Sequence, residues 1–312
     1  MSGKPASASL NMTESTSLPS LDARRGIFWM LCAMLMFSGT NVVAKLLIAH
    51  YPVMQVVWAR YFFQFLLLSI FLGPRLRRVM VTSKLKVQLV RSLLLLGTSV
   101  LFFFGLEQVA LADISAIMFV APILVTALSM PLLDERVGLR RWAGILIGFL
   151  GALIIIRPGS GMMQDAALFP LGAACLYALY QITTRFIGHA DNAMTTLFYT
   201  ASSGTVITSA LIPLFWDMPD ATGWAMMVAL GVTSNLGHFA MIKAYQAAPA
   251  ATVAPFSYAN LLWATMFGYI VFSDLPDLWT VSGAIVIASS GLYIFHRENR
   301  AGRSAPLKET TT

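Results

Sequence analysis

The chain is dominated by long apolar runs that recur along most of its length, separated by short segments with charged residues, proline or glycine. A helix that crosses a bilayer needs about 20 mainly apolar residues. Only 11% of this chain is charged, against roughly 25% in soluble domains. Because hydrocarbon offers the backbone no water, these runs must be helical, and we predict an all-α membrane protein. Its ten transmembrane helices are expected at residues 26–48, 52–72, 87–109, 113–133, 142–156, 168–187, 193–213, 222–246, 251–272 and 278–296.

Lysine and arginine indicate how the helices cross the bilayer, since these residues concentrate in cytoplasmic loops. If the N-terminus is cytoplasmic, 17 of the 21 basic residues fall on the cytoplasmic side, Lys45, Arg60 and Arg91 lie within the segments, and Arg157 falls in an opposite loop. We therefore expect a multi-pass protein of the cytoplasmic (inner) membrane with both termini in the cytoplasm. Residues 1–25 are expected to form a disordered tail, and residues 297–312 a second cytoplasmic tail.

The two halves of the chain resemble each other. Segment 37–45 aligns with segment 177–185, with aromatic, amide and basic residues in register. Further on, Phe119 corresponds to Tyr258. This correspondence over separate segments predicts an internal repeat.

Each predicted repeat, at 26–157 and 166–296, contains five helices. Because five is odd, the second copy must enter the membrane from the opposite face, as an inverted repeat. The loops agree with this arrangement. The segment 134–141 carries three arginines, whereas its counterpart 274–278 carries two aspartates and no base.

Three motifs in the first repeat point to a known type of membrane protein. They are Trp58-Ala59-Arg60 in the second helix, Asp134-Glu135-Arg136 after the fourth, and Gly144, Gly148 and Gly151 in the fifth. This pattern resembles the EamA repeat of the drug/metabolite transporter superfamily, over both predicted repeats. The second copy departs from it, with Thr200 where Arg60 would fall and no arginine after Asp274.

The resemblance implies an EamA-like basket of ten helices around a central cavity, working by alternating access. Such a secondary transporter would move a small organic metabolite: an amino acid, a vitamin such as riboflavin, a nucleoside-like compound or a drug. The alternatives are a membrane channel and a membrane scaffold without transport activity. An ATP-driven pump is disfavoured, because the G-x4-G-K-[ST] phosphate-binding sequence is absent. We expect no enzyme activity, cofactor, metal site or nucleic-acid partner, and either a monomer or a homodimer.

Polar and aromatic residues deep in the helices mark the expected substrate site, near the midplane between the repeats. The candidates are Arg60, Asn41, Gln181, Tyr180, His238, Asn235, Phe119, Tyr258, Asn260 and Trp263. Arg60 would hold a carboxylate or phosphate, or else serve as a structural residue. His238 would bind substrate or carry a proton, or else bond across a helix interface. The aromatic residues suit a planar or cationic substrate unless they only pack, and Pro122 and Pro255 would free backbone carbonyls toward the cavity.

Charged residues near the helix ends are the candidates for gates. Lys45 and Arg185 occupy equivalent positions one turn from opposite membrane faces, where they would gate the path or extend to the interface. Glu107 is the third expected gating or interface residue. All 14 acidic residues lie in tails, loops or helix ends, so we expect uniport or exchange, or else proton coupling through Glu107 or His238.

Two further patterns concern packing. Gly144 and Gly148, four residues apart, would seat a neighbouring helix or form a dimer contact. Arg91 near the start of the third helix is expected to anchor that helix on the basic side of the membrane.

Overall fold

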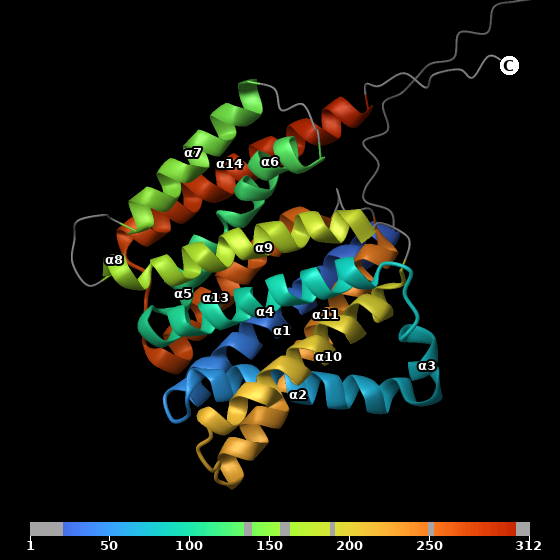
Figure 1. The fold of residues 1–312 in the computed structure, drawn as a ribbon. Helices are drawn as coiled ribbons and strands as arrows, with labels where there is room; N and C mark the ends of the chain where they lie inside the picture. The colour runs from blue at the N-terminus through green and yellow to red at the C-terminus, as the bar shows by residue number, and fades with distance from the viewer. Residues whose placement is uncertain (1–20, 134–138, 157–162, 188–190, 249–252, 304–312) are drawn as a thin grey trace, which may run out of the picture.

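The computed structural model describes residues 21–133, 139–156, 163–187, 191–248 and 253–303, which are almost entirely helical (Figure 1). The Asp134 to Arg136 motif and Arg157 lie outside these residues, as do most of the two predicted tails. The longer helices are α1 (Leu21–Ile48), α2 (Val53–Leu72), α4 (Leu85–Gln108), α5 (Leu111–Met118), α6 (Ala121–Leu133), α7 (Leu139–Ile156), α9 (Leu168–Ile187), α10 (Ala193–Leu211), α11 (Ala221–Ala247), α13 (Ala259–Phe272) and α14 (Leu278–Arg303). The short elements are η1 (Gly73–Arg75), α3 (Leu76–Val79), α8 (Met163–Ala166), η2 (Ile212–Leu214) and η3 (Ala254–Tyr258).

Ten apolar helical segments confirm the predicted all-α membrane fold. Five of them, in α1, α2, α4, α10 and α11, are individually long and apolar enough to cross a bilayer. The other five are shorter apolar stretches: Leu111–Val125, Trp142–Ile155, Leu168–Thr184, Phe256–Phe272 and Leu278–Ser290. α1 begins at Leu21, inside the segment predicted as a tail, and Arg24 and Arg25 in its first turns are exposed.

The fourth and ninth predicted helices are interrupted rather than continuous. The fourth divides into α5 and α6 at Phe119 and Val120, and the ninth begins as the 3-10 helix η3 before continuing as α13 at Ala259. Pro122 and Pro255 stand in the first turns of α6 and η3, where the missing proline N–H leaves no helical bond unmade. The break in the fourth helix therefore comes just before Pro122, whereas the change to α-helix at Ala259 comes one turn after Pro255.

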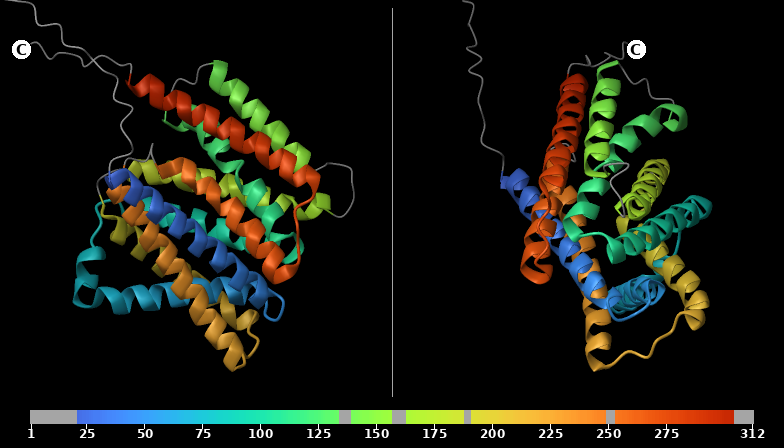
Figure 2. Two further views of the ribbon diagram at one scale, coloured as in Figure 1. Left: turned by 180° about the vertical axis from the view of Figure 1, so that it is seen from behind. Right: turned by 90° about the vertical axis from the view of Figure 1, so that its left-hand side faces the viewer.

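The two repeats interlock with two-fold pseudo-symmetry. The first helix of one repeat packs on the third helix of the other, as α1 on α11 and α9 on α4. Second helices pair as α2 with α10, fourth helices as α5 with α13, and fifth helices as α7 with α14. α7 and α14 run side by side at the top of Figure 1, and both views in Figure 2 keep them together. This exchange of partners is the arrangement expected of inverted repeats.

Glycines let α7 and α14 approach closely. A Cβ on Gly151 would lie 2.9 Å from the Gly283 carbonyl oxygen, and a Cβ on Gly283 would lie 2.6 Å from the Gly151 oxygen. On the same face of α7, Gly148 faces Ile123, and the Gly144 carbonyl accepts a hydrogen bond from Ser290. The glycine motif therefore seats neighbouring helices inside the bundle, one of the two roles predicted for it.

Adding a methyl group at this crossing should destabilise the protein. We expect Gly283→Ala to lower the apparent melting temperature in detergent, since overpacking costs about 1–3 kcal/mol. Gly39→Ala in α1 is the matched control, because nothing lies within 4 Å of an added Cβ there. Equal melting temperatures for the two variants would show that α7 and α14 are less closely packed than described.

Candidate substrate cavity

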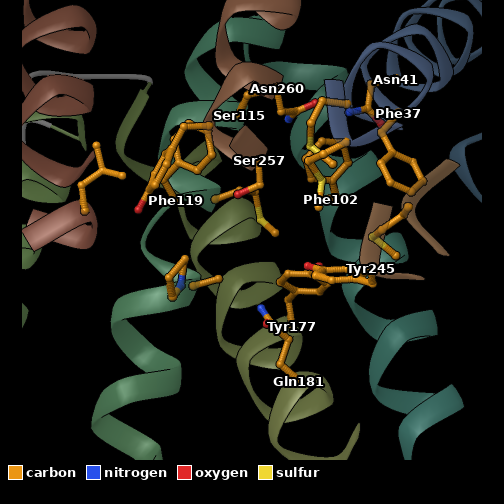
Figure 3. Close-up of a pocket in the computed structure, with 18 residues that line it drawn as sticks. Phe37, Asn41, Phe102, Ser115, Phe119, Tyr177, Gln181, Tyr245, Ser257 and Asn260 are labelled. Carbon is orange, nitrogen blue, oxygen red and sulfur yellow. The ribbon is translucent and has the colours of Figure 1, made fainter. Parts of the chain in front are cut away.

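A cavity of about 410 Å³ lies between the two repeats. It falls within the range of pockets that hold drug-sized ligands, roughly 300–1,000 Å³. Its walls come from α1, α4, α5, the start of α6, α9, α11, η3, α13 and α14. Six aromatic rings line it, those of Phe37, Phe102, Phe119, Tyr177, Tyr245 and Tyr258. In Figure 3, Phe37 and Phe119 stand on opposite sides of this space.

Polar groups on the walls are neutral. They are the amides of Asn41, Gln181 and Asn260 and the hydroxyls of Ser115 and Ser257, beside the tyrosines already named. Four methionines, Met30, Met34, Met118 and Met241, complete much of the apolar wall. Among the described residues that line the cavity, no side chain carries a charge.

The repeat correspondence brings predicted residues together in pairs. Asn41 and Gln181 face the cavity from α1 and α9, the first helices of the two repeats. Phe119 and Tyr258 lie at the two helix breaks, with ring centroids 4.9 Å apart. Discontinuous helices meeting at the pseudo-two-fold axis are a common basis of transporter binding sites. The breaks thus place equivalent residues of both repeats on one wall.

The side-chain oxygen of Asn260 lacks a hydrogen-bond partner among the described residues. Its Oδ1 atom is buried and accepts no hydrogen bond from any described residue. Buried polar atoms nearly always have a partner. Because Asn260 lines the cavity, this oxygen can accept from a ligand N–H or O–H.

Tyr180 lies one layer behind the cavity wall. It stacks on Tyr177 at 5.5 Å and accepts a hydrogen bond from Arg91 Nη2. The guanidinium of Arg91 also donates from Nε to Thr184 Oγ1 at 2.7 Å and from Nη1 to Thr200 Oγ1 at 2.9 Å. Tyr180 therefore supports the ring of Tyr177 and does not line the cavity itself.

The interpretation of Arg91 as a surface anchor is wrong. Its side chain is only 6% exposed, because α4 begins at Leu85 and turns Arg91 toward hydroxyl groups on α9 and α10. Thr200, which stands at the position of Arg60 in the second repeat, is one of its acceptors. Arg91 thus joins the third helix of one repeat to the first and second helices of the other.

Arg60 does not line the cavity either. Its Nη1 donates to Ser99 Oγ at 3.2 Å, and its guanidinium lies 5.7 Å from the Phe103 ring and 5.8 Å from the Tyr61 ring. Within the described chain, Arg60 has no carboxylate within ion-pair distance. The Nε atom of Arg60 is buried and has no hydrogen-bond partner among the described residues. Both predicted roles, structural and substrate-holding, therefore stay predictions.

His238, Asn235 and Trp263 also lie away from the cavity lining. His238 Nδ1 donates to the Ser234 carbonyl at 2.8 Å, and its ring packs edge-on against Phe37. Asn235 Nδ2 donates to the Gln64 carbonyl of α2 at 3.1 Å. Trp263 packs in an apolar cluster of α1 and α11.

The end of the bundle where α1 finishes is closed by contacts between the repeats. Lys45 Nζ lies 3.3 Å from Asp274 Oδ2 and donates to the Val109 carbonyl at 3.4 Å. It also stands 4.9 Å from the Phe272 ring. Glu107 is exposed at the end of α4, and the side chain of Arg185 is outside the described structure. Of the predicted gating residues, Lys45 is thus the one placed at a contact between repeats.

A second contact closes the same end. Tyr51 donates from Oη to Asp220 Oδ1 at 3.0 Å, and Asp220 also accepts from the Gly223 N–H at the start of α11. Hydrogen bonds from the Gly223 N–H, which has the larger effect, and from the Tyr51 hydroxyl hold the pKa of the Asp220 carboxyl below its ordinary value. The stabilisation from this cap is therefore present at neutral pH and is lost as the pH falls through that lowered pKa.

Comparison with known proteins gives one family. The model of the EamA-like transporter family matches residues 24–157 and again residues 165–295. The chain is 30% identical to a riboflavin transporter of Vibrio cholerae, over 89% of this chain and 95% of that one. It is 26% identical to an S-adenosylmethionine uptake transporter of Rickettsia felis, over 88% and 94% of the two chains. A pseudopaline exporter of Pseudomonas aeruginosa is 27% identical over 85% and 93%.

A solved crystal structure supports the fold independently. It superimposes with a TM-score of 0.62 at 16% identity, covering 88% of this chain and 98% of the other. The relatives are transporters of small solutes, and the matches cover both repeats. The predicted resemblance to the EamA repeat is confirmed, and the chain belongs to the EamA-like transporter family of multi-pass membrane proteins.

Proposed function

We propose that this transporter carries a planar heteroaromatic metabolite, neutral or positively charged, through the cytoplasmic membrane by alternating access. The observation that carries the proposal is the cavity itself, with six aromatic rings, three amides and no charged side chain among its described lining residues. Aromatic faces attract planar rings and cations. An anionic substrate would enter without a cationic partner, which is costly away from water.

The relatives support this class of substrate. Two of them are named for S-adenosylmethionine and riboflavin, and both compounds present a planar heteroaromatic ring with hydrogen-bonding edges. The free Asn260 oxygen suits an N–H or O–H on such an edge. We expect Phe119 and Tyr258, one from each repeat, to contact the flat face, because both rings line the cavity and their centroids are 4.9 Å apart.

The structure corresponds to one state of an alternating-access cycle. On α1 the cavity-lining residues run from Met30 to Asn41, whereas Lys45, one turn further on, forms the contacts that close the bundle. The cavity therefore lies near the middle of α1, before the contacts of Lys45. We assign the end with the Lys45 contacts to the non-cytoplasmic side, because the basic loops lie at the other end.

Uptake into proteoliposomes tests the proposal. Labelled riboflavin and S-adenosylmethionine should be tried as substrates, with flavin mononucleotide as an anionic competitor. We expect saturable uptake of one of the two substrates, inhibited by neutral or cationic planar compounds and not by the phosphorylated flavin. Flux that rises without saturation would indicate a channel, and stronger inhibition by the anionic flavin would overturn the substrate class.

Transport should be independent of a proton gradient. Within the described lining no carboxylate faces the cavity, and His238 lies behind Phe37 with Nδ1 bonded to Ser234. We therefore expect net substrate uptake into proteoliposomes with an imposed proton gradient to continue at an unchanged rate when a protonophore is added. The variants His238→Gln and Glu107→Gln should behave like the parent protein. If the transport rate of the parent protein instead falls when the gradient is collapsed, and one variant no longer responds to the gradient, the residue replaced in that variant is the proton carrier.

A further inference from the structure

An apolar groove lies on the outside of the bundle, between α2, α10 and α11. Its volume is about 360 Å³. The apolar lining residues are Leu67, Leu68, Phe71, Met194, Leu197, Val232, Leu236 and Phe239. The one polar residue on it, Asn235, donates to the Gln64 carbonyl. No lining residue is shared with the substrate cavity, so this is a separate feature.

Basic residues stand at one end of this groove. The short helix α3 packs through Leu76 and Val79 onto the cluster that contains Leu68, Met194 and Leu197 of the groove. The Tyr199 hydroxyl also donates to the Met80 carbonyl, which ties the end of α3 to α10. Arg75, Arg77 and Arg78, on η1 and α3, are exposed there. Figure 1 shows α3 at the end of α2.

A further basic residue lies at the same end, on a different helix. Lys243 of α11 follows the groove residue Phe239 by one turn, and its Nζ stands 5.6 Å from the Phe239 ring. α2 and α11 run parallel, since Gln55 bonds to Asp217 just before α11 and Gln64 bonds to Asn235 further along both helices. The later part of α11 therefore lies at the same face as the end of α2. Positive charge therefore flanks the groove on both the α3 side and the α11 side.

We propose that this groove binds one anionic phospholipid, with an acyl chain against the apolar wall and the phosphate near Arg77, Arg78 and Lys243. A bilayer surrounds this face, so an acyl chain is always available to it. Basic clusters beside membrane helices bind anionic lipid headgroups. A second copy of the chain fits less well, because a two-fold axis along the membrane normal would bring two arginine-bearing α3 helices together.

Native mass spectrometry of the purified protein tests this proposal. The probes are phosphatidylglycerol and phosphatidylcholine with identical acyl chains, added at equal concentration in detergent. We expect one phosphatidylglycerol to be retained in preference to phosphatidylcholine. The double variant Arg77→Gln/Arg78→Gln should lose that preference, whereas Arg24→Gln/Arg25→Gln, which removes two exposed arginines of α1, should keep it.

A groove-filling variant completes the test. Leu236 is 49% exposed, and Leu236→Trp should reduce retention of both lipids while leaving the melting temperature near that of the parent. Equal retention of the two lipids by the parent protein would overturn the proposal, as would a preference that survives Arg77→Gln/Arg78→Gln. A dimer mass that disappears in Leu236→Trp would assign the groove to a second copy of the chain instead.

Discussion

Replacing Asn260 by leucine should weaken substrate binding by roughly ten- to a hundredfold, because a missing hydrogen-bond partner costs about 1–3 kcal/mol and each 1.4 kcal/mol is about tenfold. The Oδ1 atom of Asn260 is a buried acceptor without a partner among the described residues. Leucine has a similar size, so the wall keeps its shape while this acceptor is lost. The measurement is the Kd of the purified transporter for the substrate found in the uptake assay.

A second amide in the membrane provides the control for this effect. Asn235 is occupied by its bond to the Gln64 carbonyl and lies on the outer groove. Asn235→Leu should therefore lower stability and leave the Kd unchanged. If Asn260→Leu binds substrate as tightly as the parent, the cavity described above is not the binding site.

Replacing Arg91 by leucine should give the largest loss of stability of any single change considered. A hydrogen bond to a charged group contributes roughly 1.5–3 kcal/mol, and Arg91 donates to Tyr180, Thr184 and Thr200. Such bonds are not additive, so we expect a loss of about 3 kcal/mol or more. The readouts are the yield of monodisperse protein and its melting temperature. Arg91→Lys should rescue only part of the loss, because an ammonium lacks the planar fork of donors.

An effect on substrate binding would distinguish the role of Arg91 in supporting the cavity wall from a role in packing alone. Tyr180, released from Arg91, would no longer hold the ring of Tyr177, so Arg91→Lys should also weaken substrate binding. Exposed Arg77→Gln is the matched control and should change neither property. An Arg91→Leu protein with the melting temperature and Kd of the parent would show that this network stabilises nothing.

Much of the fold follows from apolar run length, because a bilayer requires each crossing segment to be helical. The breaks at Phe119 and before Ala259 are harder to predict, since no charged residue stands near either. Pro122 and Pro255 are visible in the sequence, but proline is accepted in the first turn of a helix. A proline in the sequence therefore does not by itself show that the helix is interrupted there.

The candidate site was predictable where the repeats correspond. Asn41 with Gln181 and Phe119 with Tyr258 line the cavity as aligned pairs, because pseudo-symmetry presents both members to the same axis. The same argument extends to Phe37 and Tyr177, an aromatic pair in the aligned segments that was not among the predicted site residues. The repeat alignment is thus a sharper guide to this site than polarity.

Polarity misled where a deep polar group finds a hydrogen-bond partner away from the cavity. Arg60 bonds to Ser99 on the next helix, and His238 bonds to a carbonyl on its own helix. Which way such residues face depends on how each helix is rotated in the bundle, and a sequence pattern carries little of that information. The cavity methionines, such as Met118 and Met241, are equally hard to predict, since methionine also fills ordinary cores.

Labelling from one side of the membrane tests most directly that the two repeats are inverted. Cys32 and Cys175 are first replaced by serine, and single cysteines are introduced at the exposed residues Met80 and Met218, in equivalent loops of the two repeats. A membrane-impermeant maleimide on intact cells should then label Met218→Cys, and label Met80→Cys only after permeabilisation. Reaction of both cysteines from the same side would contradict the inverted arrangement and the cavity placed between the repeats.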